Sequence, residues 1–135
     1  MTGTDLSGGR NGKAPVVKLS SGCDLPVVGL GTYALHGNAC VSAVRTALEC
    51  GYRLIDTASM YGNEREVGEG VRASGVQREE IVVQTKLYPN EYSHAARAIE
   101  ECLSKLGLGY IDILLLHHPA SNDVSAYRAI EQAIR

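Results

Sequence analysis

The sequence lacks the features that mark several classes of protein. It has no basic block, and its formal net charge is −2, so nothing in it indicates a nucleic-acid partner or an anionic membrane surface. No apolar run reaches the roughly 18 residues that a membrane-spanning helix needs. We therefore expect a cytoplasmic protein that binds neither nucleic acid nor membrane.

The cysteines form no metal-binding or dithiol pattern. None of the four lies in a C-x-x-C pair, which leaves a zinc or dithiol site without support. Three of them lie in or beside segments that we expect to be helical. We therefore predict that no metal is bound and that the cysteines are reduced, buried thiols. They are Cys23, Cys40, Cys50 and Cys102.

The composition is that of one globular domain. Apolar residues make up 44% of the 135 residues and charged residues 21%, which is enough apolar material for a core. Residues 1–15 are rich in Gly, Ser, Thr and Asn and contain no apolar segment, so we expect a flexible leader and not a signal peptide. Residues 16–135 then form the domain.

Short apolar segments alternate with segments of helical periodicity along this domain. Residues 16–19 and 25–30 predict a short hairpin or a pair of extended segments. Further strands are expected at 53–57, 81–86 and 111–116, and we interpret the last as a continuous apolar strand that is buried on both faces.

Four helices are expected after these strands. Their starts are predicted near Asn38, Asn63, Glu91 and Asp123, and the last helix has Ala126, Ile130, Ala133 and Ile134 on its expected inner face. Four successive strand–helix units predict an α/β fold in which helices cover a parallel sheet.

Polar or ionisable residues lie at the end of each predicted strand. They are Gly31 and Thr32, then Asp56, then Lys86, and finally His117 and His118. Taken singly, Asp56 could be a helix cap, Lys86 a solvated strand end and His117 a core histidine. In parallel α/β folds, however, sites gather at the carboxyl ends of the strands, so the joint pattern predicts an active site.

Tyr61 follows Asp56 by five residues, on the loop after the second of these strands. A tyrosine phenol has a reference pKa of about 10 and is a poor acid at neutral pH. An ammonium group about 4 Å away would favour the phenolate by roughly 4 kcal/mol at an effective dielectric of about 20. We expect Lys86 to supply that charge and Asp56 to hold Lys86 in place. With His117 orienting a carbonyl oxygen or sharing its proton, these roles fit general acid catalysis on a carbonyl.

One motif favours a different fold. Residues 29–34 satisfy G-x-G-x-x-A, and Asp56 lies at about the right distance for a Rossmann dinucleotide site. In that motif the glycines open a helix directly, whereas here His36-Gly37-Asn38 delays the helix. A Rossmann site would also leave Tyr61 and Lys86 without a role, so we favour the first interpretation.

Several longer motifs resemble those of one family. Gly51-Tyr52-Arg53-Leu54-Ile55-Asp56-Thr57-Ala58, followed by Tyr61-Gly62-Asn63-Glu64, closely resembles the aldo-keto reductase signature. Gly29-Leu30-Gly31-Thr32 resembles the family's first strand, Gln84-Thr85-Lys86-Leu87 the segment with its lysine, and Leu116-His117-His118-Pro119 the segment with its histidine. The resemblance covers residues 16–135.

The resemblance implies a (β/α)₈ TIM barrel, of which this chain supplies the first four βα units after a short β-hairpin. It implies an NAD(P)H-dependent oxidoreductase that passes hydride from NADPH, or from NADH, to the carbonyl of a small aldehyde or ketone. In such an enzyme Tyr61 would donate the proton, Asp56 and Lys86 would tune it, and His117 would orient the substrate.

The resemblance also implies where the ligands lie. Gly31, Thr32 and Asp56 would lie along the nicotinamide, and Tyr33 and His118 would line the substrate pocket. The family often has a tryptophan at both of these last places, whereas this chain has none, so the aromatic wall of the pocket differs here.

The chain is short for a complete barrel, which needs about 250 residues. A half-barrel leaves two open sheet edges and an uncovered apolar face, which predicts self-association. Two alternatives to an enzyme stay open. One is a non-enzymatic binding module on the same fold, and the other is a catalytically inactive half-barrel that acts only with a partner half or as a dimer.

Overall fold

The computed structural model describes residues 12–134 of the chain. Residues 1–11 of the expected leader therefore lie outside the described residues. The last residues of the expected leader contact the domain: Lys13 pairs with Glu80, and the Ala14 N–H donates to the Gly51 carbonyl at 3.0 Å.

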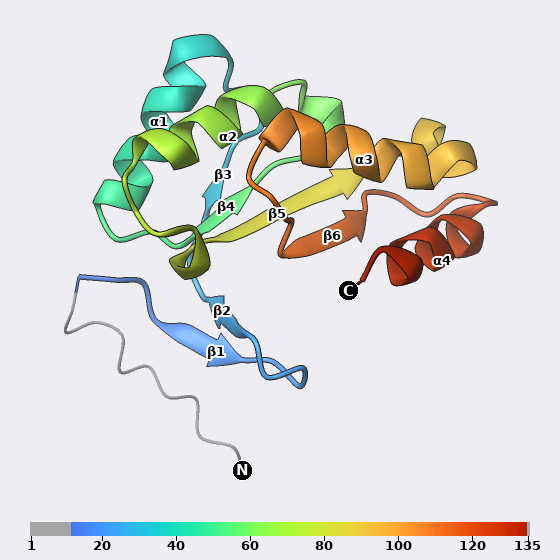
Figure 1. Ribbon diagram of the computed structural model, residues 1–135, viewed down its shortest axis with the longest axis horizontal. Coiled ribbons are helices and arrows are strands. Elements are labelled where there is room, and N and C mark those ends of the chain that lie inside the picture. Colours follow the sequence, from blue (N-terminus) through green and yellow to red (C-terminus); the bar gives the residue numbers. More distant parts are fainter. Residues whose placement is uncertain (1–11, 135) are drawn as a thin grey trace.

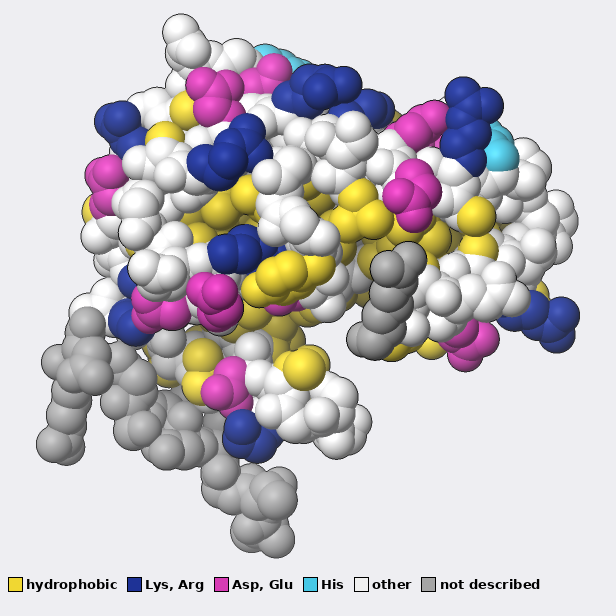
Figure 2. Space-filling model, viewed as in Figure 1, with side chains coloured by type: hydrophobic (Ala, Val, Ile, Leu, Met, Phe, Trp, Pro, Cys, Tyr) yellow, Lys and Arg dark blue, Asp and Glu magenta, His cyan; other side chains and the backbone are white. Residues whose placement is uncertain are grey.

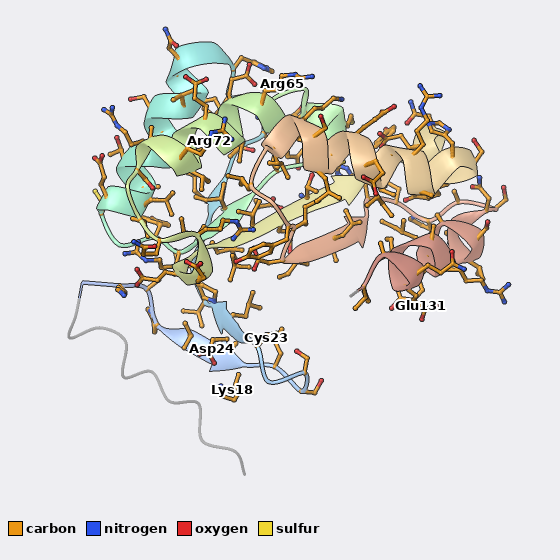
Figure 3. The ribbon with its side chains drawn as sticks, in the orientation of Figure 1. Lys18, Cys23, Asp24, Arg65, Arg72 and Glu131 are labelled. Carbon is orange, nitrogen blue, oxygen red and sulfur yellow. The ribbon has the colours of Figure 1, made fainter. Side chains whose placement is uncertain are left out.

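A β-hairpin precedes the main sheet, as the sequence predicts. Strands β1 (Val16–Lys18) and β2 (Asp24–Pro26) pair antiparallel, and Val17 lies opposite Leu25. The labelled side chains of Lys18 and Asp24 belong to this hairpin (Figure 3), and the Lys18 Nζ donates to Asp24 Oδ1 at 2.8 Å. The hairpin lies below the rest of the fold in Figure 1.

The main sheet consists of four parallel strands in sequence order. They are β3 (Leu30–Gly31), β4 (Leu54–Asp56), β5 (Val82–Leu87) and β6 (Ile113–Leu116). Each strand leads into one helix: α1 (Gly37–Glu49), α2 (Glu64–Ala73), α3 (Ala95–Leu106) or α4 (Asp123–Ala133). Consecutive helices pack against each other, and α1, α2 and α3 lie along one face of the sheet (Figure 1). The fold is therefore α/β, with four βα units after a hairpin.

The alternation of side chains along β5 separates a buried face from a face that carries polar side chains. In β5, Val83, Thr85 and Leu87 are buried, whereas Gln84 and Lys86 lie on the opposite face. The buried side chains join two hydrophobic clusters that the helices cover, one centred on α1 and α2 and the other on α3 and α4. The face of β5 that carries Gln84 and Lys86 points away from these helices and can carry a site.

Close contact between helices depends on one glycine. A Cβ at Gly68 in α2 would lie 1.9 Å from the Leu106 carbonyl oxygen at the end of α3. No side chain fits at that distance, so Gly68 allows α2 and α3 to approach each other. The predicted stop of α3 is also confirmed, since Gly107 caps the helix with a left-handed φ of 60°.

Several predicted boundaries are wrong by a few residues. Helix α1 begins at Gly37 with His36 as its N-cap, two residues before the predicted cap Asn38. The helix expected from Glu91 is preceded by a 3₁₀ helix, η4 (Pro89–His94), and α3 itself begins at Ala95. Glu91 accepts the Tyr88 N–H at 2.7 Å, and this local cap with Pro89 favours a tight turn over an α-helical start.

The prediction that β6 is buried on both faces is wrong. Asp112 interrupts the apolar run, and its carboxylate accepts hydrogen bonds from the Val83 N–H and from Arg78, so the strand begins only at Ile113. Leu115 is 41% exposed, because the described residues cover the strand on one face only.

Two other burial predictions need correction. On α4, Ala126 and Ile130 are buried, but Ala133 is exposed and Ile134, which lies beyond the end of the helix, is 74% exposed. Only half of the cysteines are buried thiols. Cys40 and Cys102 lie in helix interiors, whereas Cys23 in the hairpin turn and Cys50 at the end of α1 are exposed.

Candidate active site

An ion pair joins two neighbouring strands at their carboxyl ends. The Lys86 Nζ lies 2.6 Å from Asp56 Oδ1, and their side chains are only 13% and 29% exposed. Lys86 also donates to the Thr57 carbonyl at 2.9 Å, and Gln84 Nε2 donates to the same Asp56 oxygen at 2.7 Å. The register places Asp56 opposite Gln84, so the pair follows directly from parallel pairing of β4 with β5. Because both side chains are largely removed from water, the ion pair is strengthened, and the lysine charge is held in one place.

Tyr61 lies beside this pair. It ends a 3₁₀ turn, η2 (Ser59–Tyr61), that follows β4, and the next residue, Gly62, has the left-handed φ of 66° that ends the turn. The Lys86 Nζ lies 5.1 Å from the centroid of the Tyr61 ring. Asp56 and the Thr57 carbonyl accept two of the three ammonium protons of Lys86. The third proton is left for a hydrogen bond to an oxygen near the phenol.

A pair of histidines lies near the Tyr61 ring. The His117 ring centroid is 5.9 Å from that of Tyr61, and His117 and His118 stack with centroids 4.6 Å apart. The ring of Tyr88 stands edge-on to both histidines, at 5.6 and 5.5 Å. The structure therefore places Asp56, Tyr61, Lys86 and His117 together, where the sequence expects them.

His117 is held towards its neutral form. Burial lowers its pKa, His118 and Lys86 lower it further, and the negative charge of Asp56 opposes them. Among the described residues its Nδ1 atom is buried without a hydrogen-bond partner. A neutral imidazole can donate or accept a proton, which suits a group that orients a carbonyl oxygen.

The lowered pKa predicts a pH dependence of stability. The unfolded chain binds the His117 proton at a higher pH than the folded chain does, so acid favours unfolding. The free energy of unfolding should therefore fall as the pH drops below about 6.5, and this contribution should stop changing once the pH passes the folded pKa. An NMR titration of the ring C–H signals, assigned with His117→Asn, measures the folded pKa directly. A His117 pKa above that of a histidine in a short peptide would contradict the prediction.

The other predicted ligand-binding residues lie around this group and differ in their exposure to solvent. Thr32 is fully buried, and its hydroxyl donates to the Asp56 carbonyl at 2.9 Å. Gly31 is exposed, and the space where a Cβ would lie is open. Tyr33 is 69% exposed, with its ring centroid 5.2 Å from that of Tyr61, and His118 is also exposed.

Sequence reasoning missed three residues of this site. Tyr88 directly follows β5, so its position at a strand end could have indicated it. Gln84 lies two residues before Lys86 and shares its face by alternation. Asn63 has the N-cap position of α2 but makes no side-chain cap. It is buried instead and bonds to the loops around Tyr61, which no local spacing indicates.

The Rossmann alternative is not supported by this arrangement. Thr32 to His36 separate β3 from α1, so the glycines of the motif do not open a helix. Nor does the site lie in the surface hollow between η4, α3 and α4, because none of the residues predicted for the site lines that hollow. The candidate site lies on the open face at the carboxyl ends of the strands.

The described part of the chain contains neither a candidate metal cluster nor a candidate membrane-spanning helix. Within residues 12–134, no three or more His, Cys, Asp or Glu side chains are grouped so that they could hold a metal ion. Over the same range, each helix falls short of the length and apolar character that crossing a membrane requires.

Comparison with known proteins identifies the family. Residues 27–135 match the Aldo/keto reductase family, and the chain belongs to it. It is 43% identical to morphine 6-dehydrogenase of Pseudomonas putida over 91% of this chain and 43% of that protein. It is 44% identical to glycerol 2-dehydrogenase (NADP(+)) of Saccharomyces cerevisiae over 80% of this chain and 35% of that protein.

Solved structures show the same relationship. An aldo-keto reductase from a Medee basin deep-sea metagenome library is 45% identical, with a TM-score of 0.81 over 87% of this chain and 44% of that one. An aldo-keto reductase of Bombyx mori, solved in complex with NADP, is 35% identical, with a TM-score of 0.80 over 90% of this chain and 47% of that one. The chain thus spans less than half the length of these relatives, and its fold is part of a (β/α)₈ barrel.

Proposed function

We propose that this chain is the first half of an NADPH-dependent reductase that converts aldehydes and ketones to alcohols, with Tyr61 as the proton donor. The observation that carries the proposal is the position of the Lys86 Nζ, which is paired with Asp56 at 2.6 Å and lies 5.1 Å from the Tyr61 ring centroid. His117, with its ring centroid 5.9 Å from that of Tyr61, completes the set. We use the term full-length reductase for this half joined to the rest of its barrel.

Each of these residues has a separate role in the reaction. Tyr61 gives its phenolic proton to the carbonyl oxygen as the carbonyl carbon becomes an alcohol carbon. The Lys86 ammonium offsets the negative charge left on the phenolate, and Asp56 keeps that ammonium in place. Neutral His117 hydrogen-bonds to the same substrate oxygen and aims it at Tyr61.

The edge of the sheet fits a nicotinamide cofactor. A bound nicotinamide would supply the hydride. Gly31 is exposed with open space above its Cα, so a flat ring can approach the backbone of β3 there. Thr32 is fully buried, and its hydroxyl and its N–H both donate to the Asp56 carbonyl, so Thr32 would support the cofactor by fixing this edge of the sheet. In support, one structural relative was solved with NADP, and one curated relative is named for NADP(+).

The substrate would be a small carbonyl compound held beside Tyr61. We assign the walls of its pocket to Tyr33 and His118, because both are exposed aromatic groups next to the proposed proton donor and His117. The cytoplasmic location and the lack of nucleic-acid or membrane partners remain predictions from the composition.

The full-length reductase should reduce simple aldehydes and prefer NADPH to NADH. Loss of absorbance at the nicotinamide wavelength, measured with each cofactor in turn, gives kcat/KM for both. A clear preference for NADH would contradict the cofactor assignment, and no turnover with either cofactor across a panel of aldehydes and ketones would contradict the proposed function.

A second candidate function is an inactive half-barrel that acts only when it associates with a partner half or a second copy. It is favoured because, among residues 12–134, the outer strands β3 and β6 each pair on one side only, and because Leu115 on β6 is exposed. Figure 2 shows hydrophobic side chains gathered at the level of the sheet, between the helices and the hairpin. Unpaired strand edges and bare apolar faces recruit partners.

The 135-residue chain on its own should therefore self-associate and bind NADPH weakly. Sizing chromatography combined with a nicotinamide fluorescence titration tests both expectations. A stable monomer that binds NADPH at micromolar concentration and reduces an aldehyde would show instead that four βα units suffice.

A further inference from the structure

Asn63 is a fully buried polar residue two positions after Tyr61. Although it occupies the N-cap position of α2, its side chain does not cap the helix. Its Oδ1 atom accepts a hydrogen bond from the Thr57 hydroxyl at 2.6 Å, and its Nδ2 atom donates to the carbonyls of Thr32 at 2.8 Å and Leu35 at 3.0 Å. Both amide protons are thus used. A helix cap would instead use its side-chain oxygen to accept a hydrogen bond from a backbone N–H in the first turn of the helix.

The partners of Asn63 are parts of the site. The Thr57 carbonyl accepts a hydrogen bond from the Lys86 Nζ, and the Thr32 hydroxyl donates to the Asp56 carbonyl. The carboxamide of Asn63 therefore joins the loop after β3 to the loop after β4, and both loops contact the Asp56–Lys86 ion pair. A shift of Asn63 would be transmitted to both of these loops.

The turn that carries Tyr61 is attached at its two ends. At the start of η2, the Ser59 hydroxyl donates to the carboxylate of Glu91 in η4. At the other end, only Gly62 separates Tyr61 from Asn63, and glycine contributes no side-chain contact of its own. Since Tyr61 itself is only partly buried, the position of its ring beside Lys86 depends on these two attachments together with the neighbouring rings of Tyr33 and His117.

We propose that Asn63 is a positioning residue for the proton donor: its buried carboxamide fixes the turn after β4 to the β3 loop and so holds the Tyr61 phenol over the Lys86 ammonium. The proposal rests on the proposed function for its catalytic consequence. Its structural part, the placement of the Tyr61 ring, can be measured without turnover. The alternative is that Asn63 only stabilises the fold.

Asn63→Asp is the sharpest test, because it keeps the size of the side chain and the acceptor for Thr57 but removes both N–H donors. The control is Thr85→Val, which removes another fully buried hydrogen bond, from Thr85 to Glu64 at 2.7 Å, at the start of the same helix. Thr85 faces the helices and has no bond to the Tyr61 turn. Both variants should lose stability, but only the first should misplace Tyr61.

In the full-length reductase, kcat of Asn63→Asp should fall by about 10²-fold while KM for NADPH stays near the wild-type value, since small misplacements of a reacting group cost this much. The pH dependence of kcat should also change, because the phenol then lies differently relative to Lys86. Thr85→Val should keep both kcat and its pH dependence. Equal losses of kcat in the two variants, each matching the loss of folded protein, would overturn the proposal.

Incorporated 3-fluorotyrosine gives a readout that needs no catalysis. The ¹⁹F signal of Tyr61, assigned by its absence in Tyr61→Phe, should shift and broaden in Asn63→Asp and stay in place in Thr85→Val. If the wild-type protein reduces no carbonyl but this signal moves, the proposed function fails and the positioning role stands. If the wild-type protein is active and neither the signal nor kcat changes in Asn63→Asp, the positioning role fails.

Thr57→Val serves if Asn63→Asp does not fold. It removes one of the three bonds of Asn63 and leaves the Thr57 carbonyl in place for Lys86. A shift of the Tyr61 ¹⁹F signal in this variant supports the proposal, and an unchanged signal overturns it.

Discussion

Tyr61→Phe should abolish carbonyl reduction by the full-length reductase while NADPH binding survives. The substitution removes the only proton that the Tyr61 ring can give and leaves its contacts with Tyr33 and His117 in place. A positioned general acid contributes about 10²–10⁴-fold to a rate, so kcat should fall at least that far, to little or no measurable turnover. The phenol is expected to contribute little to cofactor affinity, because it faces the substrate oxygen.

Aldehyde-dependent oxidation of NADPH measures the rate, and a fluorescence titration measures the cofactor affinity. Tyr127→Phe is the matched control, since Tyr127 is 55% exposed on α4, outside the site, and loses the same hydroxyl. Reduction of a simple aldehyde by Tyr61→Phe at close to the wild-type rate would rule out Tyr61 as the acid.

Lys86→Met should lower both activity and stability. Without the ammonium, nothing offsets the charge on the phenolate, so proton transfer becomes unfavourable. The Asp56 carboxylate loses its charged partner and keeps only the Gln84 amide and water, which costs about 1–3 kcal/mol for a charged group left short of partners. Urea unfolding and kcat together measure the two effects.

Adding Asp56→Asn to Lys86→Met separates these effects. The double variant no longer holds an unpaired carboxylate, so its stability should recover towards the wild-type value, whereas its activity should stay low. A double variant as inactive and as unstable as Lys86→Met would mean that Asp56 does not account for the lost stability. Near-normal turnover of Lys86→Met would contradict the proposed role of the lysine.

The main elements of the site could be predicted because they follow from strand geometry. Parallel strands bring their carboxyl ends to one edge, so Asp56, Lys86 and His117 come together once three strands are recognised. Alternation along β5 also determines that Lys86 faces away from the helices. Both arguments need only local sequence.

Other features depend on partners that are distant in the sequence, and local patterns misjudge them. Asparagine before a helix is usually a cap, but Asn63 bonds to Thr32 and Leu35, which lie 31 and 28 residues away. The start of α3 depends on Glu91, whose carboxylate also accepts from Ser59 in another turn. Apolar character alone could not show that Leu115 is exposed, since it does not say which face the rest of the chain covers.

The strictly sequential order of the strands has a consequence for how the protein is made. Because β3, β4, β5 and β6 pair in the order in which they leave the ribosome, each new strand can dock on the one before it. At roughly 5–20 residues per second, all four proposed catalytic groups can be assembled within seconds of His117 emerging. Among the described residues β6 pairs only with β5, so during that interval its free edge can act as a template for a strand of another chain.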